Sequence, residues 1–171
     1  MRGALLSRHF WGLFFPLLFL LLLGCADAGQ GEAVGRVSWV HDGDTLKVDG
    51  IGTVRLIGVD VPETASSYRD QYLRRQGVAS SIQRQTAKKA LHFVIGEAKG
   101  KQVSLCFDGE RKDRHGRTLA YVILPDGRNL NRLLLEEGLA AVYRRFDFQL
   151  KKEFLTAEKE ARGAGRGMWK K

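Results

Sequence analysis

The sequence has few of the residues that cross-link a small fold or stiffen its loops: its 171 residues include two cysteines and three prolines. Two cysteines cannot form the several disulfides on which many small secreted domains depend, so we expect no disulfide framework and a fold that rests on an apolar core. The length suits one compact domain with its own core. A second domain would have to be very small.

Acidic residues are in short supply as well, with 19 Asp and Glu against 28 Lys and Arg and a formal net charge of +9. The basic excess is concentrated in residues 69–101 and 144–171. Such a balance suits a polyanionic partner, either nucleic acid or anionic lipid headgroups. Solvated helix faces would explain either basic segment alone.

No uncharged apolar run has the length of an ordinary membrane-spanning helix. The longest, residues 10–23, has 14 residues and follows Arg2 and Arg8, whereas a span needs roughly 20 residues. These are the proportions of a signal peptide, to which we assign residues 1–24. Extending the run to Ala26 gives 17 uncharged residues, so an uncleaved anchor is an alternative.

The end of this run, Leu22-Leu23-Gly24-Cys25, resembles the lipobox of bacterial lipoproteins, in which the cysteine becomes the lipidated first residue of the mature chain. We therefore predict lipidation of Cys25, with residues 25–33 as a tether and 34–171 as the domain. The protein would then be anchored to a membrane of the cell envelope and face the periplasm or the exterior. Cleavage after Ala28 would instead give a soluble secreted protein, and Cys25 would then be incidental.

Turn residues and strand-like runs alternate in the first part of the domain. Runs at 34–40, 45–48 and 51–59 are separated by Asp42-Gly43-Asp44 and Asp49-Gly50, which predicts an antiparallel meander that ends at Pro62. Residues 64–77 have no clear period and are expected to be a surface loop. Within it lies a cluster of arginines that could touch the substrate: Arg69, Arg74 and Arg75.

The rest of the chain predicts three helices and two further strands. Apolar spacing of three and four predicts a helix over 78–95 with Gly96 as its stop, and shorter helices are expected at 130–137, before Gly138, and at 148–161. Strands are expected at 103–107, where Cys106 would be a buried apolar residue, and at 117–124. We therefore predict an α+β, mainly β fold, a five-stranded closed barrel of the oligonucleotide-binding type with three helices outside.

Carboxylates are crowded at the ends of the first strands. Asp42, Asp44, Asp60 and Glu63 lie near strand ends, with Arg55 between them in the sequence. Crowded carboxylates repel one another and weaken a fold unless a cation or a substrate compensates them. The pattern indicates a metal site with an arginine beside it.

Three ordered motifs resemble the staphylococcal nuclease (thermonuclease) family. They are Asp42-Gly43-Asp44-Thr45, then Arg55-Leu56 with Val59-Asp60-Val61-Pro62-Glu63-Thr64, then Asp113-Arg114-His115-Gly116-Arg117 with Leu119-Ala120-Tyr121. The likeness covers roughly residues 34–169. It implies an oligonucleotide-binding barrel and a Ca²⁺-dependent endonuclease that hydrolyses DNA and RNA to 5′-hydroxyl and 3′-phosphate ends.

The resemblance also implies a role for particular residues. Asp44 and Asp60 would be the metal carboxylates, with the backbone carbonyl of Val61 as a third ligand. Glu63 would meet the metal through water and act as general base. The scissile phosphate would be gripped by Arg55 and Arg117. These residue types suit the chemistry, because Ca²⁺ prefers hard oxygen ligands and arginine is charged at any working pH.

Two departures from the family pattern are expected to alter substrate binding more than the reaction itself. Val61 stands where threonine is usual, and this change keeps the backbone carbonyl available as a metal ligand. His115 stands where a tyrosine often holds the terminal phosphate, so Arg114 and His115 are candidate substrate contacts. His115 could equally be an exposed turn residue. Tyr143 lies near a tyrosine that lines the nucleotide pocket, although it could equally be a core aromatic. Asp42 could cap its turn or support the metal site, and Asp113 is expected to be a turn residue.

Two other functions fit the same sequence. The barrel could bind nucleic acid through its basic helices without cutting it, in which case Glu63 would be dispensable. Alternatively, an envelope structural protein could use its charge to bind anionic lipid. No segment demands an oligomer, and we expect a monomer.

Overall fold

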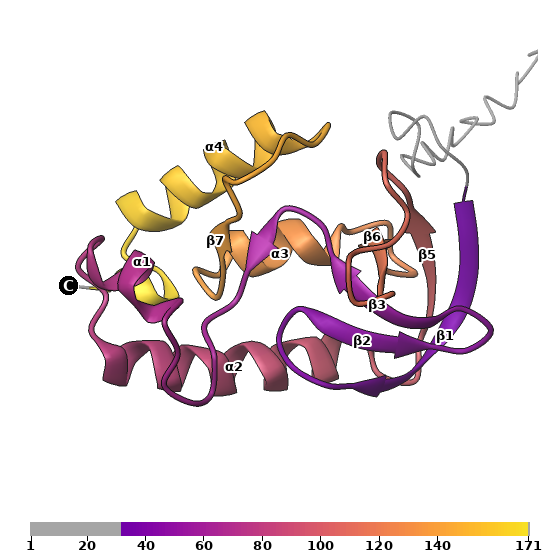
Figure 1. Ribbon diagram of the computed structural model, residues 1–171, viewed down its shortest axis with the longest axis horizontal. Coiled ribbons are helices and arrows are strands. Elements are labelled where there is room, and N and C mark those ends of the chain that lie inside the picture. The colour runs from indigo at the N-terminus through magenta and orange to yellow at the C-terminus, as the bar shows by residue number, and fades with distance from the viewer. Residues whose placement is uncertain (1–31, 171) are drawn as a thin grey trace, which may run out of the picture.

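The computed structural model describes residues 32–170, and within them five strands close into a barrel (Figure 1). The strands are β1 (Glu32–Val40), β2 (Thr45–Val48), β3 (Gly52–Leu56), β5 (Gln102–Cys106) and β6 (Thr118–Ile123). Their order around the barrel is β1-β2-β3-β6-β5. The predicted meander is confirmed by the antiparallel pairs β1-β2 and β2-β3, and the parallel pair β3-β6 helps to close the barrel.

Alternating side chains explain why these segments form half-buried strands. In β2, Leu46 and Val48 are fully buried whereas Lys47 between them is exposed, and β3 buries Val54 and Leu56 in the same way. Each such aliphatic side chain contributes roughly 1.5 to 3 kcal/mol when it leaves water. The barrel interior is therefore the main apolar core. The small number of cysteines led us to expect a fold that rests on such a core.

The run at 51–59 is not one strand, contrary to the prediction. β3 ends at Leu56, the chain turns at Ile57 and Gly58, and β4 (Val59–Asp60) pairs with β7 (Ala141–Val142) in a separate two-stranded ribbon. Gly58 has a φ of 76°, a left-handed conformation that favours glycine. This turn carries Asp60 out of the barrel sheet.

A buried asparagine holds that turn in place. The amide nitrogen of Asn131 donates to the carbonyl of Ile57 at 2.9 Å, and its Oδ1 accepts from the backbone N–H of Val122 at 3.0 Å. Asn131 belongs to α3 (Leu130–Glu136) and is inaccessible to solvent. Because buried amides need such partners, Asn131 ties α3, β6 and the Gly58 turn together.

The other helices depart from the sequence expectations at two places. α2 (Ser80–Ala98) continues through Gly96, since the burial of Val94 and Ala98 against the barrel core outweighs the helix-breaking tendency of one glycine. α4 (Lys151–Gly163) begins after 148, because Phe148 belongs to the loop before it. A short helical turn, η1 (Gly167–Trp169), completes the described chain.

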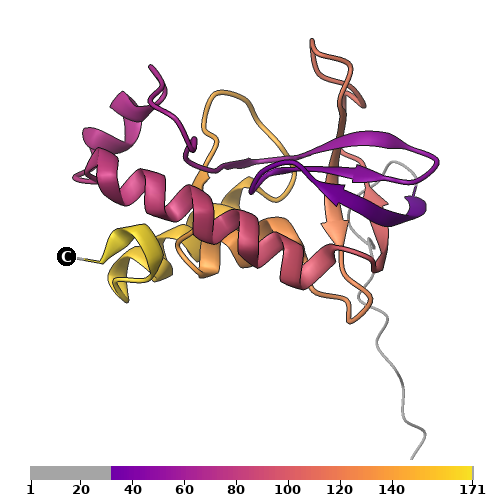
Figure 2. The ribbon, with the colours of Figure 1, turned by 90° about the horizontal axis from the view of Figure 1, so that it is seen from below.

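The supposed loop at 64–77 contains a helix, α1 (Asp70–Arg74). The barrel lies at one end of the molecule, and α1, η1 and the C-terminus lie at the other, with α2 running between the two ends (Figures 1 and 2). α1 and the residues around it pack through a small second cluster that comprises Leu73, Val78, Ala141, Ala161, Met168 and Trp169.

The cysteine predictions have different outcomes. Cys106 is buried, as expected. Cys25 and the predicted signal peptide lie outside the described residues. Within residues 32–170, no helix is long and apolar enough to span a bilayer.

Candidate active site

A cleft of about 1200 Å³ opens between the barrel and the segment around α1. Its walls come from the turn before β2, the chain from β3 to Glu63, the α1 segment, the β5–β6 loop and the loop after β7. Nine candidate site residues line this one cleft: Asp44, Arg55, Asp60, Val61, Glu63, Arg114, His115, Arg117 and Tyr143. The fold therefore brings together residues that are up to 99 positions apart in the sequence, although their individual roles remain predictions.

Asp44 is the most buried carboxylate of the cleft, with 7% of the residue exposed. Its Oδ1 accepts a hydrogen bond from the Thr45 hydroxyl at 3.0 Å, and its Oδ2 accepts one from the backbone N–H of Val61 at 3.3 Å. Asp42 in turn accepts from the backbone N–H of Asp44 at 2.9 Å. Asp42 therefore caps its turn, which was one of the two alternatives for this residue.

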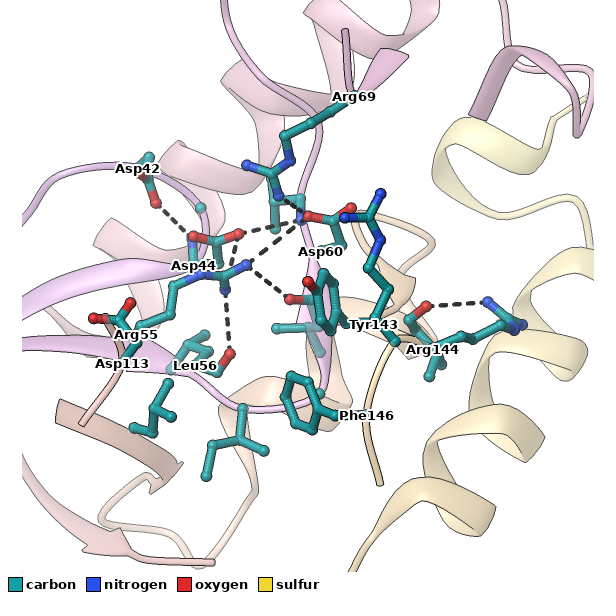
Figure 3. A pocket seen from close by; sticks show the side chains of 18 of the residues that line it. Asp42, Asp44, Arg55, Leu56, Asp60, Arg69, Asp113, Tyr143, Arg144 and Phe146 are labelled. Carbon is teal, nitrogen blue, oxygen red and sulfur yellow. Dashed lines mark hydrogen bonds and ion pairs between the residues drawn. The ribbon is translucent and has the colours of Figure 1, made fainter. Parts of the chain in front are cut away.

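Arg55 projects from β3 between the two candidate metal carboxylates (Figure 3). Its Nη1 lies 3.0 Å from Asp44 Oδ2, and its Nη2 lies 3.9 Å from Asp60 Oδ1. The guanidinium also donates to the carbonyl oxygens of Leu56 at 3.2 Å and Val59 at 3.0 Å. With carbonyls as well as carboxylates around it, the guanidinium is fixed in orientation.

Arg69, which the sequence predicted only as one of three arginines that could touch the substrate, contacts the acids of the site. It is the residue before α1, and its guanidinium forms ion pairs with both Asp60 and Glu63. Figure 3 shows it reaching toward Asp60 from the side opposite the barrel. The only sequence signal was the cluster of arginines in 64–77, which gave no indication of their partners.

Two carboxyl groups of the cleft, those of Asp42 and Asp60, have raised pKa values. Burial, together with the charge of Asp44, raises the pKa of Asp42 to about 6. Burial also raises the pKa of Asp60, despite the opposing effect of Arg69 and Arg55. Carboxyl groups whose ionised form is disfavoured in this way gain from an additional positive charge.

The donor set is compatible with a hydrated divalent cation. In residues 32–170, no three Asp, Glu, His or Cys side chains form a metal-binding group by themselves. Asp44 and Asp60 supply hard carboxylate oxygens, and the hydrogen bond from the Val61 N–H to Asp44 keeps that backbone segment beside them. Ca²⁺ accepts carboxylates, carbonyls and water together, so these residues fit an open site completed by water.

Arg117 enters the cleft from the other side, held by Asp113. Asp113 Oδ2 lies 2.7 Å from both Nε and Nη2 of Arg117, and its Oδ1 accepts from the backbone N–H groups of His115 and Arg117. Burial opposes ionisation of Asp113, but the hydrogen bonds from Arg117 hold its pKa below the usual value. Asp113 is thus a turn residue, as expected, and it also orients Arg117.

The neighbouring candidates of the same loop are exposed. Arg114 Nε donates to His115 Nε2 at 3.1 Å, and both side chains reach solvent at the rim of the cleft. They are accessible to a bound strand without being fixed by the core.

Tyr143 lies on the wall of the cleft and not in the core. It is half-buried, and its ring centroid lies 5.2 Å from that of Phe146, which is 43% exposed. Phe146 in turn packs 5.9 Å from the buried Phe148. The sequence analysis missed Phe146, whose exposed ring offers a surface on which a base can stack.

Comparisons with known proteins agree with these motifs. The family model described as staphylococcal nuclease homologue matches residues 53–171. An uncharacterized protein of Methanocaldococcus jannaschii is 38% identical in an alignment that covers 98% of this chain and 97% of that protein. The chain belongs to the staphylococcal nuclease family. A thermonuclease of Staphylococcus hyicus is 34% identical over 83% of this chain and 79% of its own length.

Staphylococcal nuclease homologues also occur within larger proteins. The endonuclease YhcR of Bacillus subtilis is 31% identical over 83% of this chain, but the match covers 12% of that protein. Membership of the staphylococcal nuclease family confirms the resemblance drawn from the three motifs. Together with the closed barrel of five strands, it confirms the predicted oligonucleotide-binding type of fold.

Proposed function

We propose that this chain is a Ca²⁺-dependent endonuclease that hydrolyses phosphodiester bonds in DNA and RNA and leaves 5′-hydroxyl and 3′-phosphate ends. Nuclease activity in general is supported by the family and by relatives named thermonuclease and endonuclease. One structural observation carries the proposal for this chain. A candidate base, Glu63, and two arginines, Arg55 and Arg117, line the same cleft as the paired carboxylates.

The two arginines are suited to bind a phosphodiester. Arg55 is held by two carbonyls and a buried carboxylate, and Arg117 is held by Asp113, so neither guanidinium has to be ordered when the substrate arrives. Their forked donors match the phosphate oxygens, on which negative charge increases in the transition state. Loss of one such preorganised donor typically slows the chemical step by roughly a hundred- to a thousandfold.

Glu63 is the candidate base, and its side chain is 42% exposed on the cleft, where water can reach it. It would orient a water molecule and accept its proton as the water oxygen attacks phosphorus. Asp44, Asp60 and the Val61 carbonyl would hold Ca²⁺. When bound, the ion would polarise the phosphate and lower the charge repulsion between substrate and carboxylates.

Residues outside the described region determine where this activity would take place. We propose that Cys25 is lipidated and anchors the protein in the cell envelope, with a soluble secreted form as the alternative. Mass spectrometry of the mature N-terminus distinguishes a diacylglyceryl-modified Cys25 from cleavage after Ala28. We also propose that the mature protein is a monomer.

A non-cutting nucleic-acid-binding protein is the second candidate, and one observation favours it. Arg69 pairs with Asp60 and Glu63, two of the acids that the reaction would need. If that arrangement persisted in the presence of Ca²⁺ and substrate, the cleft would bind strands without cleaving them.

The test is cleavage of single-stranded DNA, duplex DNA and RNA by the purified protein, with Ca²⁺ and with a chelator. The nuclease proposal predicts endonucleolytic cutting that requires Ca²⁺ and yields 3′-phosphate ends, which a phosphatase converts to 3′-hydroxyls. Salt-sensitive binding of the same substrates without any cutting would instead establish the binding protein.

A further inference from the structure

Two cations compete for one set of carboxylates in this cleft, and one of them is part of the chain. Arg69 pairs with Asp60 and with Glu63. Asp60 is a candidate ligand of Ca²⁺, and Glu63 is the candidate base that would meet the ion through water. Arg69 occupies one oxygen of each carboxylate, Asp60 Oδ1 and Glu63 Oε1, so it competes with a hydrated divalent ion for these groups.

The backbone that carries Arg69 is fixed, whereas its side chain is not. Next to it, Asp70 is buried and lies 2.6 Å from Arg84 of α2. The side chain of Gln83, also buried, donates to the carbonyl oxygens of Asp70 at 3.2 Å and Val78 at 2.9 Å. The Arg69 side chain is 35% exposed, so it can change partners without movement of α1.

Arg69 is held less completely than Arg55, which contacts the same Asp60. Arg55 donates to the backbone carbonyls of Leu56 and Val59, which are not among the candidate metal ligands. Among the described residues, the side-chain hydrogen bonds of Arg69 go only to the two carboxylates. A divalent ion at Asp60 therefore removes the partners of Arg69 while Arg55 keeps its carbonyl contacts.

We propose that Arg69 is a third arginine of the site that exchanges partners: it pairs with Asp60 and Glu63 in the absence of Ca²⁺, and when Ca²⁺ binds it moves to a phosphate of the nucleic acid strand in the cleft. This inference rests on the proposed nuclease function and adds a substrate contact to it. A strand is a suitable new partner because Arg69 lines the cleft beside the other arginines, and released guanidinium groups pair well with phosphate.

The first test measures Ca²⁺ affinity by isothermal titration calorimetry without nucleic acid. Arg69→Gln removes the competing cation and should raise the affinity about three- to fivefold, the upper part of the range for a partly exposed ion pair. Arg75→Gln is the matched control, since Arg75 lies on the same segment and lines the cleft but donates to the carbonyl of Gln71. It should raise the affinity less than roughly twofold, through general charge alone.

The second test measures binding of a single-stranded phosphorothioate oligonucleotide, which resists hydrolysis. With Ca²⁺, Arg69→Gln should weaken binding about threefold or more and reduce the slope of log affinity against log salt by about 0.7, the value for one phosphate contact on a single strand. With a chelator, the same substitution should not weaken binding, because Arg69 is then paired with the carboxylates.

The outcomes separate this inference from the function on which it rests. If the wild type binds Ca²⁺ and cuts, but Arg69→Gln leaves Ca²⁺ affinity unchanged or lowers it, the exchange is wrong and the nuclease proposal stands. If Arg69→Gln raises Ca²⁺ affinity but does not weaken oligonucleotide binding in the presence of Ca²⁺, the proposed contact between Arg69 and phosphate does not exist. If the wild type neither binds Ca²⁺ nor cuts, the proposed function fails and the exchange fails with it.

Discussion

The carboxylate of Asp113 holds the guanidinium of Arg117 at two points, with Oδ2 2.7 Å from both Nε and Nη2. Its other oxygen accepts two backbone N–H groups of the same loop. One side chain thus shapes the β5–β6 loop and aims a candidate catalytic arginine into the cleft.

Asp113→Asn should therefore impair catalysis through Arg117. A misplaced arginine typically costs roughly ten- to a hundredfold in kcat/KM, and we expect a loss in that range. Steady-state kinetics of the two single variants and the double variant with Arg117→Ala tests whether Asp113 acts through Arg117. The Asp113 substitution should add little once Arg117 is absent, whereas fully additive losses would show that Asp113 acts independently.

The Gly58 turn should tolerate no side chain. A Cβ at Gly58 would lie 2.6 and 2.7 Å from two ring carbons of Phe148, and the φ of 76° is itself unfavourable for alanine. We expect Gly58→Ala to lower the free energy of unfolding by about 3 kcal/mol, from backbone strain and overpacking together. It should also reduce cleavage, because this turn places Asp60.

Gly50 provides a matched control for that substitution. It has the same φ of 76°, but a Cβ there meets no atom within 4 Å. Gly50→Ala should therefore lower the free energy of unfolding only through backbone strain, by about 1 kcal/mol. Urea denaturation measures both variants. Equal losses at the two positions would contradict the packing argument.

The Asp70–Arg84 pair should stabilise the α1 segment in a pH-dependent way. Burial opposes ionisation of Asp70, but the hydrogen bonds from Arg84 and the Ser67 backbone lower its pKa below the usual value for an aspartate. A lowered pKa in the folded state means that the stabilisation is present above the unfolded pKa, about 3.9, and is lost as the pH falls through the folded value.

Asp70→Asn should accordingly lower the free energy of unfolding by about 2 kcal/mol at pH 7, and by progressively less below pH 4. Urea denaturation between pH 3 and pH 7 measures this difference. Asp147→Asn removes a carboxylate that is 96% exposed and should have a smaller effect. A difference between wild type and Asp70→Asn that does not change with pH would contradict the ion-pair account.

Patterns local in the sequence predicted the barrel and most of the site. Turn residues such as Asp42-Gly43-Asp44 and strand-like runs of four to nine residues depend on neighbouring positions, and the meander followed from them. The candidate carboxylates and arginines converge because their motifs stand at or near strand ends that line one cleft. Even so, the family resemblance supplied their roles.

Features that depend on contacts between residues far apart in the sequence could not be predicted. α1 has five residues and no apolar period, and it is held by Asp70, Arg84 and buried Gln83. α2 passes Gly96 because the barrel buries residues on both sides of that glycine. The partners of Arg69 are set by how α1 packs, so no motif within 64–77 could reveal them.

The most direct test of the account compares Glu63→Gln with the wild type in single-turnover cleavage of single-stranded DNA at saturating Ca²⁺. Glu110→Gln is the control, since Glu110 is an exposed glutamate that lines the same cleft from the β5–β6 loop. Loss of a general base should slow the Glu63 variant at least about a hundredfold, while the Glu110 variant cuts at close to the wild-type rate. Cleavage by Glu63→Gln at the wild-type rate would contradict the central claim that this cleft is a nuclease active site with Glu63 as its base.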